Sequence, residues 1–343
     1  MNAVPLPVFD HILRMTDGRG TFEHAAFDEP RTEHGYCTDD MARVLVVTAR
    51  EPRPTPAAAA LCEVSLRFLR EADGGDGGYR NRLDHDGHWT DRPTFDDCWG
   101  RSLWGLGTAA ARADAAEVRE TAGIQFERAV RQRSPWLRAM SFAALGAAEV
   151  VAVIPDHEGG RALLGDAADR IATATATSRG HGRWPWPEPR LSYANAVIPE
   201  VLLAAGSLLD RPRLVSDGLD LLRWLVDHET TDGHLSVTPA GGSGPGDGRP
   251  AFDQQPIEVA AIADACARAA ALDGDDCWPQ AVAAAIAWFL GDNDGGHVMW
   301  DASTGGGFDG LEATGPNRNQ GTESTLAFIS TLQHAHRPAL VLR

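Results

Sequence analysis

The sequence has few of the features that assign a chain to a familiar chemical class. Cysteine is sparse: Cys37, Cys62, Cys98, Cys266 and Cys277 are an odd number at irregular spacing, with no C-x-x-C pair. Neither a disulfide framework nor a zinc ribbon follows from that arrangement. No G-x-S-x-G, P-loop or H-E-x-x-H sequence is present, so these serine-hydrolase, nucleotide-binding and zinc-protease signatures are missing. We expect neither a cofactor nor a bound metal.

Long apolar runs and an excess of positive charge are also missing. No apolar stretch reaches the roughly 20 residues of a membrane-spanning helix. Residues 1–20 carry Asp10, Arg14 and Asp17 where a signal peptide would be apolar. Lys and Arg number 31 against 48 Asp and Glu, a net charge of −17, which disfavours nucleic acid and anionic membranes as partners. We expect a cytoplasmic protein that binds neither; its oligomeric state is not indicated.

The residues that are plentiful favour a helical globular protein. Hydrophobic residues make up 43% of the chain, and Trp occurs 10 times, proportions typical of a folded domain. Alternating Val, Ile or Thr runs are scarce, whereas Ala- and Leu-rich segments with helical spacing are frequent. The sequence therefore predicts an all-α fold.

A short polar motif recurs at intervals of about 60 residues, each time before an apolar helix. Its clearest form is Phe95-Asp96-Asp97-Cys98-Trp99-Gly100-Arg101. The echoes are Tyr36-Cys37-Thr38-Asp39-Asp40-Met41-Ala42-Arg43, Tyr193-Ala194-Asn195, Phe252-Asp253-Gln254-Gln255-Pro256-Ile257-Glu258 and Asn319-Gln320-Gly321-Thr322-Glu323-Ser324. This pattern indicates one helical unit, repeated, with polar residues at the start of alternate helices.

The predicted helices are joined by short and long connections, mostly in alternation. In a chain of antiparallel helical hairpins, alternate connections lie at the same end, so the long, motif-bearing loops would gather at one end. About twelve helices in six hairpins predict an (α/α)6 toroid, forming one domain over residues 1–343. The Gly- and Pro-rich segment 231–250 is the place where a linker between two helical domains could lie instead.

With this architecture, Asp pairs before helices and Trp-rich loops, the chain resembles the six-hairpin glycosidase superfamily. The stretches Asp97-Cys98-Trp99-Gly100-Arg101 and Asp253-Gln254-Gln255-Pro256-Ile257-Glu258 also look similar to uncharacterised bacterial proteins found beside glycosyltransferases. The resemblance implies sugar chemistry and does not specify a reaction.

Aromatic residues in the long loops stand beside carboxylates, amides and arginines, a combination suited to sugars, which stack on rings and hydrogen-bond through their hydroxyls. The residues expected to contact an oligosaccharide or glycoside substrate are Asp40, Trp99, Arg101, Trp184, Trp186, Glu188, Arg190, Tyr193, Asn195, Asp253, Gln254 and Trp300. Trp184 and Trp186 lie in a proline-stiffened segment that would form one wall of a cleft. For each Trp the alternative is packing of a loop on the helices.

Hydrolysis of a glycosidic bond typically uses two carboxyl groups, one as acid and the other as base or nucleophile. Asp97 is the predicted acid, because its neighbour Asp96 and apolar surroundings would both disfavour ionisation. Glu258 and Glu323 are the predicted partners, since their side chains reach further. A glycoside hydrolase is therefore the favoured function.

Each of these carboxylates also has a structural alternative. Asp is a favoured helix N-cap, which suits Asp96, and Glu in a first turn suits a capping box. Arg43 and Arg101 follow Asp40 and Asp97 at the spacing of an ion pair within one helix.

Two other functions stay open. The first is a sugar epimerase or isomerase on the same toroid, with acid–base histidines from the long loops. Those histidines are His24, His34, His181 and His297. The second is a non-catalytic carbohydrate-binding partner of a glycosyltransferase. Cys37 and Cys98 occupy equivalent motif positions and could hold zinc with a loop histidine, although small buried residues explain them better.

Overall fold

The computed structural model describes residues 4–180 and 184–336, and within these ranges the chain forms twelve α-helices. They are α1 (Asp10–Arg14), α2 (Thr38–Ala49), α3 (Pro56–Ala72), α4 (Asp97–Arg112), α5 (Ala116–Ala129), α6 (Leu137–Val153), α7 (Glu158–Gly180), α8 (Val197–Leu208), α9 (Pro212–His228), α10 (Pro256–Leu272), α11 (Cys277–Phe289) and α12 (Thr322–His336). The predicted all-α class is confirmed.

The strands are short and lie in the loops between helices. They are β1 (Ala25–Ala26), β2 (Glu29–Pro30), β3 (Tyr36–Cys37), β4 (Arg82–Leu83), β5 (Thr230–Thr231), β6 (His234–Leu235), β7 (Gly310–Glu312) and β8 (Gly315–Asn317). Each pairs with one other strand, antiparallel, in a two-stranded sheet. These ribbons stiffen the long loops without adding a layer to the fold.

Local signals account for several helix starts. Pro56, Pro212 and Pro256 occupy first-turn positions of α3, α9 and α10, where a missing N–H costs nothing and the fixed φ suits a helix. The Thr55 side chain accepts a hydrogen bond from the Ala58 amide, which caps α3.

The chain separates into two compact units, which we describe one at a time. The N-terminal unit comprises Phe9–Asp169 with Leu208–Asp210, and the C-terminal unit comprises the described parts of 170–207 and 211–336, with residues 4–8. The division falls within α7, after Asp169. The organisation of residues 1–343 as one domain stays a prediction.

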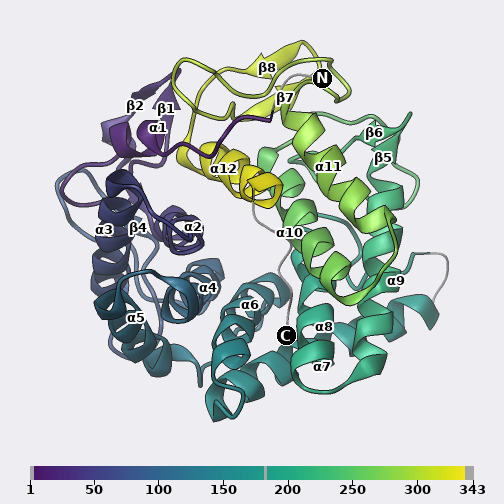
Figure 1. The fold of residues 1–343 in the computed structure, drawn as a ribbon, viewed down its shortest axis with the longest axis horizontal. Helices are drawn as coiled ribbons and strands as arrows, with labels where there is room; N and C mark the ends of the chain where they lie inside the picture. Colours follow the sequence, from purple (N-terminus) through teal and green to yellow (C-terminus); the bar gives the residue numbers. More distant parts are fainter. Residues whose placement is uncertain (1–3, 181–183, 337–343) are drawn as a thin grey trace. The chain divides into compact units, whose positions relative to one another are not determined.

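In the N-terminal unit, α4 packs against α2, α5 and α6, and α3 packs against α2 (Figure 1). At its glycines, the contact of α4 with α6 is made by backbone. A Cβ atom added at Gly107 would overlap the carbonyl of Gly146, and one added at Gly146 would overlap the carbonyl of Leu103. Glycine is required here because the two helices approach too closely for a side chain.

The starts of α2, α4 and α6 lie at one end of this unit. The Thr38 amide donates to the Asn81 carbonyl over 2.9 Å, and the Cys98 thiol donates to the Tyr79 carbonyl over 3.3 Å. The segment between Tyr79 and Asn81 therefore holds α2 and α4 together. Trp136, just before α6, donates from Nε1 to Asp96 Oδ1 over 2.7 Å.

In the C-terminal unit, α10 packs against α11 and α12 and also contacts α9. The starts of its motif-bearing helices are linked as well. Gln254, before α10, exchanges two backbone hydrogen bonds with Leu311 of β7. The Gly321 amide, before α12, donates to Asp309 Oδ1 over 2.7 Å. The motif residues thus share one end within each unit; their gathering at one end of a single ring stays a prediction.

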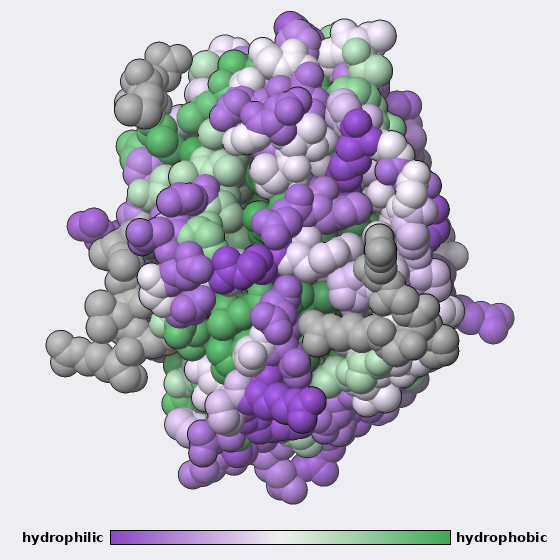
Figure 2. Space-filling view, turned by 90° about the vertical axis from the view of Figure 1, so that its right-hand side faces the viewer, coloured by the Kyte–Doolittle hydropathy of each residue, from purple (hydrophilic) through white to green (hydrophobic). Residues whose placement is uncertain are grey.

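On the face shown in Figure 2, hydrophilic residues are widely spread and hydrophobic areas lie between them. Interspersion of this kind is usual, because apolar atoms contribute much of any folded protein's accessible surface. None of the helices in the described part of the chain is long and apolar enough to cross a membrane.

Candidate functional site

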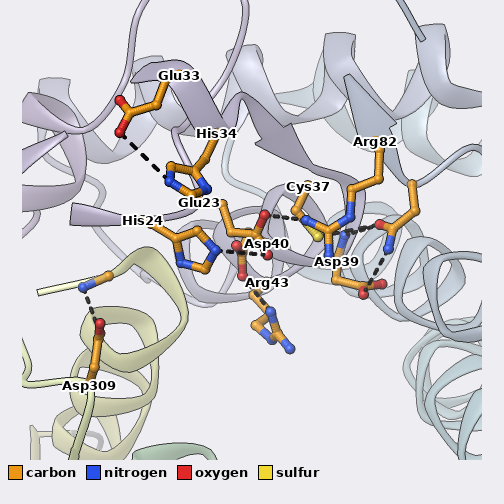
Figure 3. A network of polar contacts seen from close by, with 12 residues as sticks. Glu23, His24, Glu33, His34, Cys37, Asp39, Asp40, Arg43, Arg82 and Asp309 are labelled. Carbon is orange, nitrogen blue, oxygen red and sulfur yellow. Dashed lines mark hydrogen bonds and ion pairs between the residues drawn. The ribbon is translucent and has the colours of Figure 1, made fainter. Parts of the chain in front are cut away.

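The start of α2 carries a dense group of charged side chains (Figure 3). Asp40 is 2% exposed, and its Oδ1 accepts a hydrogen bond from Arg43 Nη1. The predicted ion pair at this spacing is confirmed. Glu23 accepts a charge-assisted hydrogen bond from Arg82, and Asp39 Oδ2 accepts one from Asn81 Nδ2 over 3.4 Å.

Ligand atoms of Glu23, Cys37 and Asp40 lie within 4.8 Å of one another, a spacing at which a cation could be considered. The chemistry of the three groups does not favour one. Arg82 and Arg43 already balance the two carboxylates. Burial, together with the nearby carboxylates, raises the pKa of the Cys37 thiol well above its ordinary value, so sulfur remains a protonated donor and a poor ligand.

The central motif, residues 95–101, lies at the start of α4. Asp96 is the N-cap residue, as the capping alternative predicts, but its side chain makes no capping hydrogen bond and instead accepts from Trp136. Asp97 is half-buried in the first turn of α4. Trp99, expected to contact substrate, is fully buried and packs edge-on against Phe95, so it presents no ring face to solvent.

Arg101 differs from the sequence-based expectation of an ion pair with Asp97. It is 3% exposed, its Cζ lies 4.0 Å from the centre of the Phe142 ring, and it makes no hydrogen bond or ion pair with any residue that the structure describes. The ion-pair alternative is therefore wrong for Arg101. Residues four apart on a helix can meet, but the position of α6 directs this guanidinium over Phe142 instead.

The segment containing Trp184 and Trp186 packs on α9. Trp186 is fully buried and stacks on Trp224, with centroids 5.9 Å apart. Trp184 meets Trp224 edge-on at 5.1 Å, and His228 stacks on Trp224 at 5.1 Å. These four rings form an aromatic cluster, which suits the packing alternative for Trp186. His181 lies outside the described residues.

The remaining predicted residues of this segment have different surroundings. Glu188 is half-buried and its backbone carbonyl accepts from Trp184 Nε1 over 2.9 Å. Arg190 is exposed and pairs with Asp247 over 2.9 Å. Tyr193 is exposed at the approach to α8. The ion pair between Arg190 and Asp247 links two loops.

Glu258, a predicted catalytic residue, holds the approach to α8. It is 2% exposed. Its carboxylate accepts hydrogen bonds from the amides of Ala194 and Asn195 and, over 2.9 Å, from Asn195 Nδ2. Ala194 has φ of 45°, a left-handed conformation that a non-glycine residue adopts only where its surroundings hold it. This turn ends just before α8, which begins at Val197, so the motif Tyr193-Ala194-Asn195 directly precedes the helix.

Asp253 and Gln254 precede α10 and differ sharply. Gln254 is fully buried, and its side chain donates to Asp294 Oδ2 over 2.6 Å and accepts from Trp288 Nε1 over 3.3 Å. Asp253 is half-buried, and its Oδ1 is buried without a hydrogen-bond partner among the described residues. Burial, and then the charge of Glu312, raise the pKa of the Asp253 carboxyl.

Gly310 makes room for the Asp253 carboxyl. A Cβ atom at this glycine would overlap Asp253 Oδ1, so a larger residue would displace the acid from its position. Among the other predicted residues, Glu323 is half-buried in the first turn of α12. Trp300 is half-buried and stacks on Phe328 at 5.2 Å.

A buried polar group lies next to the aromatic cluster. Glu229 is fully buried and accepts two hydrogen bonds from Thr238, and burial raises the pKa of its carboxyl. Arg249 donates to the Ser236 carbonyl and to Thr238 Oγ1. Burial first, and then the charge of Arg249, lower the pKa of His228 to about 4.

Sequence reasoning missed Trp136. It is 59% exposed, and its indole is held by the 2.7 Å hydrogen bond to Asp96. A rigid exposed ring beside carboxylates is a suitable platform for a sugar face. The available signal was its position: Pro135-Trp136 directly precedes a helix, next to the loop end that carries Asp96 and Asp97.

No family model and no curated protein matches the chain. Solved structures do. A sugar epimerase from a ruminal bacterium has 11% identity and a TM-score of 0.72, over 96% of this chain and 95% of that one. Cellobiose 2-epimerase from Bacillus thermoamylovorans has 13% identity and a TM-score of 0.69, over 95% of each chain. A metagenome-derived family 9 endoglucanase has 14% identity and a TM-score of 0.56, over 92% and 70%.

At these identities the likeness shows the fold. It confirms the predicted all-α fold class, and the fold that the chain shares with these sugar-processing enzymes agrees with the predicted (α/α)6 arrangement of helices. Fold alone does not assign a reaction, which depends on the side chains of the site.

Proposed function

We propose that the protein is a carbohydrate-active enzyme that hydrolyses a glycosidic bond with two carboxyl groups. The solved structures that share its fold include enzymes described as epimerases, an isomerase and an endoglucanase, all acting on sugars. In this chain the first turns of the motif-bearing helices carry Asp or Glu at α2, α4, α10 and α12, and no histidine. That residue choice favours carboxylate chemistry.

The observation that carries the proposal is the state of Asp253. A general acid for glycoside cleavage must hold a proton near neutral pH, and burial raises the pKa of this carboxyl. Its buried Oδ1 has no hydrogen-bond partner among the described residues, and Gly310 leaves the space that it occupies. Asp253 therefore replaces Asp97 as our preferred acid.

Glu323 is our preferred second carboxylate. It lies in the first turn of α12, which packs against α10 in the same unit as Asp253. It is half-buried rather than enclosed, as a group that activates water or attacks a sugar must be. Glu258 is less suited, because its carboxylate already accepts three hydrogen bonds from the turn before α8; we assign it to positioning Tyr193 and Asn195.

The test uses aryl glycosides of several sugars. Asp253→Asn is expected to lower kcat about a thousandfold, the usual size of a lost general acid, and a leaving group that needs no proton should restore part of it. Glu323→Gln should lower kcat whichever leaving group is used. Asp276→Asn is the matched control, since Asp276 is an exposed carboxylate before α11. Full turnover by Asp253→Asn would reject this assignment.

Epimerisation is the second candidate, and two observations favour it. The sugar epimerase has the highest TM-score of the three structures compared above. His24 and His34 lie edge to face with centroids 5.1 Å apart (Figure 3), and two imidazoles could exchange a proton at a sugar carbon. Exchange of deuterium from heavy water into a reducing sugar, lost in His24→Ala and His34→Ala, would identify this reaction in place of hydrolysis.

A further inference from the structure

Arg101 is a buried charge that the described chain does not balance. Arg101 is 3% exposed, its Nε is buried without a hydrogen-bond partner, and among the described residues its guanidinium lies over the Phe142 ring rather than against a carboxylate. Removing an ion from water without a partner costs several kcal/mol. A guanidinium cannot lower that cost by losing its proton.

The position of Arg101 on α4 shows which way it is directed. Gly100 and Gly107 contact α6, and Gly105 contacts Ala42 of α2. Ala110 faces Gly123 of α5, and at 100° per residue Arg101 falls on the opposite side of the helix from Ala110. Arg101 therefore lies on the face of α4 between its contacts with α2 and α6, away from α5.

A second buried arginine, which has an interaction of its own, and two helix starts lie near Arg101. Arg138, also 3% exposed, stands on α6 one turn before Phe142, the ring beneath the Arg101 guanidinium. Arg101 follows the first turn of α4, and Arg138 is in the first turn of α6; helix N-termini carry partial positive charge. On α2, the Asp40 carboxylate is paired with Arg43.

We propose that Arg101 binds an anionic group of a ligand of the N-terminal unit, and that this ligand is an acidic sugar carrying a carboxylate or a phosphate. Planar carboxylates and phosphates match the two parallel N–H groups of a guanidinium. The exposed Trp136 ring, next to the start of α6, would then face the apolar side of the sugar. The sugar part of this inference rests on the proposed function; the anion part rests on Arg101 alone.

The experiment measures binding by calorimetry on the full chain, without turnover. Glucuronate, glucose 6-phosphate and glucose serve as probes with one ring and different charge. We expect glucuronate, glucose 6-phosphate or both to bind at least tenfold more tightly than glucose. Glucuronate alone would indicate a carboxylate substrate, and glucose 6-phosphate alone a phosphorylated one. Equal or absent binding of all three probes would overturn the proposal.

Variants locate the effect. Arg101→Gln should reduce binding of the preferred anionic probe at least tenfold without lowering the melting temperature of the free protein, because it removes an unbalanced buried charge. Arg101→Lys should lose less affinity, since the charge remains and only the paired geometry is lost. Arg70→Gln, an exposed arginine on α3, is the matched control. Unchanged binding of the anionic probe by Arg101→Gln would overturn the proposal. If Arg101→Gln does not fold, equal affinity of Arg101→Lys and the wild type for that probe would overturn it.

The binding experiment can fail or succeed independently of the test of the proposed hydrolase function. Anion binding that depends on Arg101, in a protein that hydrolyses no glycoside, would leave this inference standing and reject the hydrolase. Hydrolysis of neutral glycosides with normal kinetics in Arg101→Gln would do the reverse.

Discussion

Glu258 and Asn195, 63 residues apart in the sequence, are joined by two hydrogen bonds to the same carboxylate oxygen. The other oxygen accepts from the Ala194 amide. The carboxylate thus fixes the turn through which the chain enters α8, and it presents the exposed Tyr193 beside it. A residue chosen from the sequence for catalysis therefore has a clear structural task.

Glu258→Gln should destabilise the fold. The amide group can replace only one acceptor and leaves a buried backbone N–H unpaired, which costs about 2 kcal/mol. Urea unfolding would show the loss, and Glu312→Gln, at an exposed carboxylate, should show almost none. Unchanged stability with abolished turnover would return Glu258 to the list of catalytic residues.

The two tryptophans Trp186 and Trp136 should respond in opposite ways to replacement by alanine. Trp186→Ala empties a fully buried position against Trp224 and should lower the free energy of unfolding by about 3–5 kcal/mol. Trp136→Ala removes a ring that is 59% exposed, so the melting temperature should stay nearly constant while sugar binding weakens. If Trp186→Ala left the melting temperature unchanged and weakened binding, the cleft-wall hypothesis would be correct instead.

Gly107→Ala should disrupt the contact between α4 and α6. The added methyl group would overlap the Gly146 backbone, which cannot rotate away, and overpacking of this kind costs about 1–3 kcal/mol or more. Gly123→Ala in α5 is the matched control, with no atom closer than 3.9 Å to the new Cβ; it should stabilise the protein by about 0.5–1 kcal/mol. Equal effects of the two variants on urea unfolding would contradict the close approach.

His228 should make the protein less stable in acid. Burial lowers the pKa of its imidazole from 6.5 to about 4 in the folded protein, so the unfolded chain takes up a proton first and stability falls as pH drops from about 6.5 to about 4. Because the ring is half-buried, we expect about 1–2 kcal/mol rather than the full value of the shift.

The comparison with His228→Phe isolates this contribution. Asp253 and Glu229 have raised carboxyl pKa values and act in the opposite sense, since their stabilisation is lost as pH rises through the carboxyl range. Both remain in the variant. The difference in melting temperature between wild type and His228→Phe should therefore change between pH 7 and pH 4, and a constant difference would contradict the buried neutral imidazole.

Local sequence signals located the helices because they act over a few residues. Pro256 marks the start of α10, and α2 and α4 begin inside their polar motifs, at Thr38 and Asp97. Local residues do not fix the entry to α8, because its turn depends on Glu258, far along the chain. A left-handed Ala194 has no local signature in the sequence.

The site was harder to predict because burial is a property of the assembled fold. Trp186 stacks on Trp224 of α9, and no residue in the segment around Trp186 indicates that partner. Arg101 stands at ion-pair spacing from Asp97, but the packing of α6 directs it to Phe142. Spacing indicates which side chains can meet; the neighbouring helix decides which do.

The burial of the cysteines has a practical consequence. Cys37, Cys62, Cys98 and Cys266 are buried, and Cys277 alone among the five is partly accessible. A maleimide dye added to the folded protein should therefore label Cys277 first, at the start of α11. The rates at which the other four thiols react would then measure how often the structure around each of them opens.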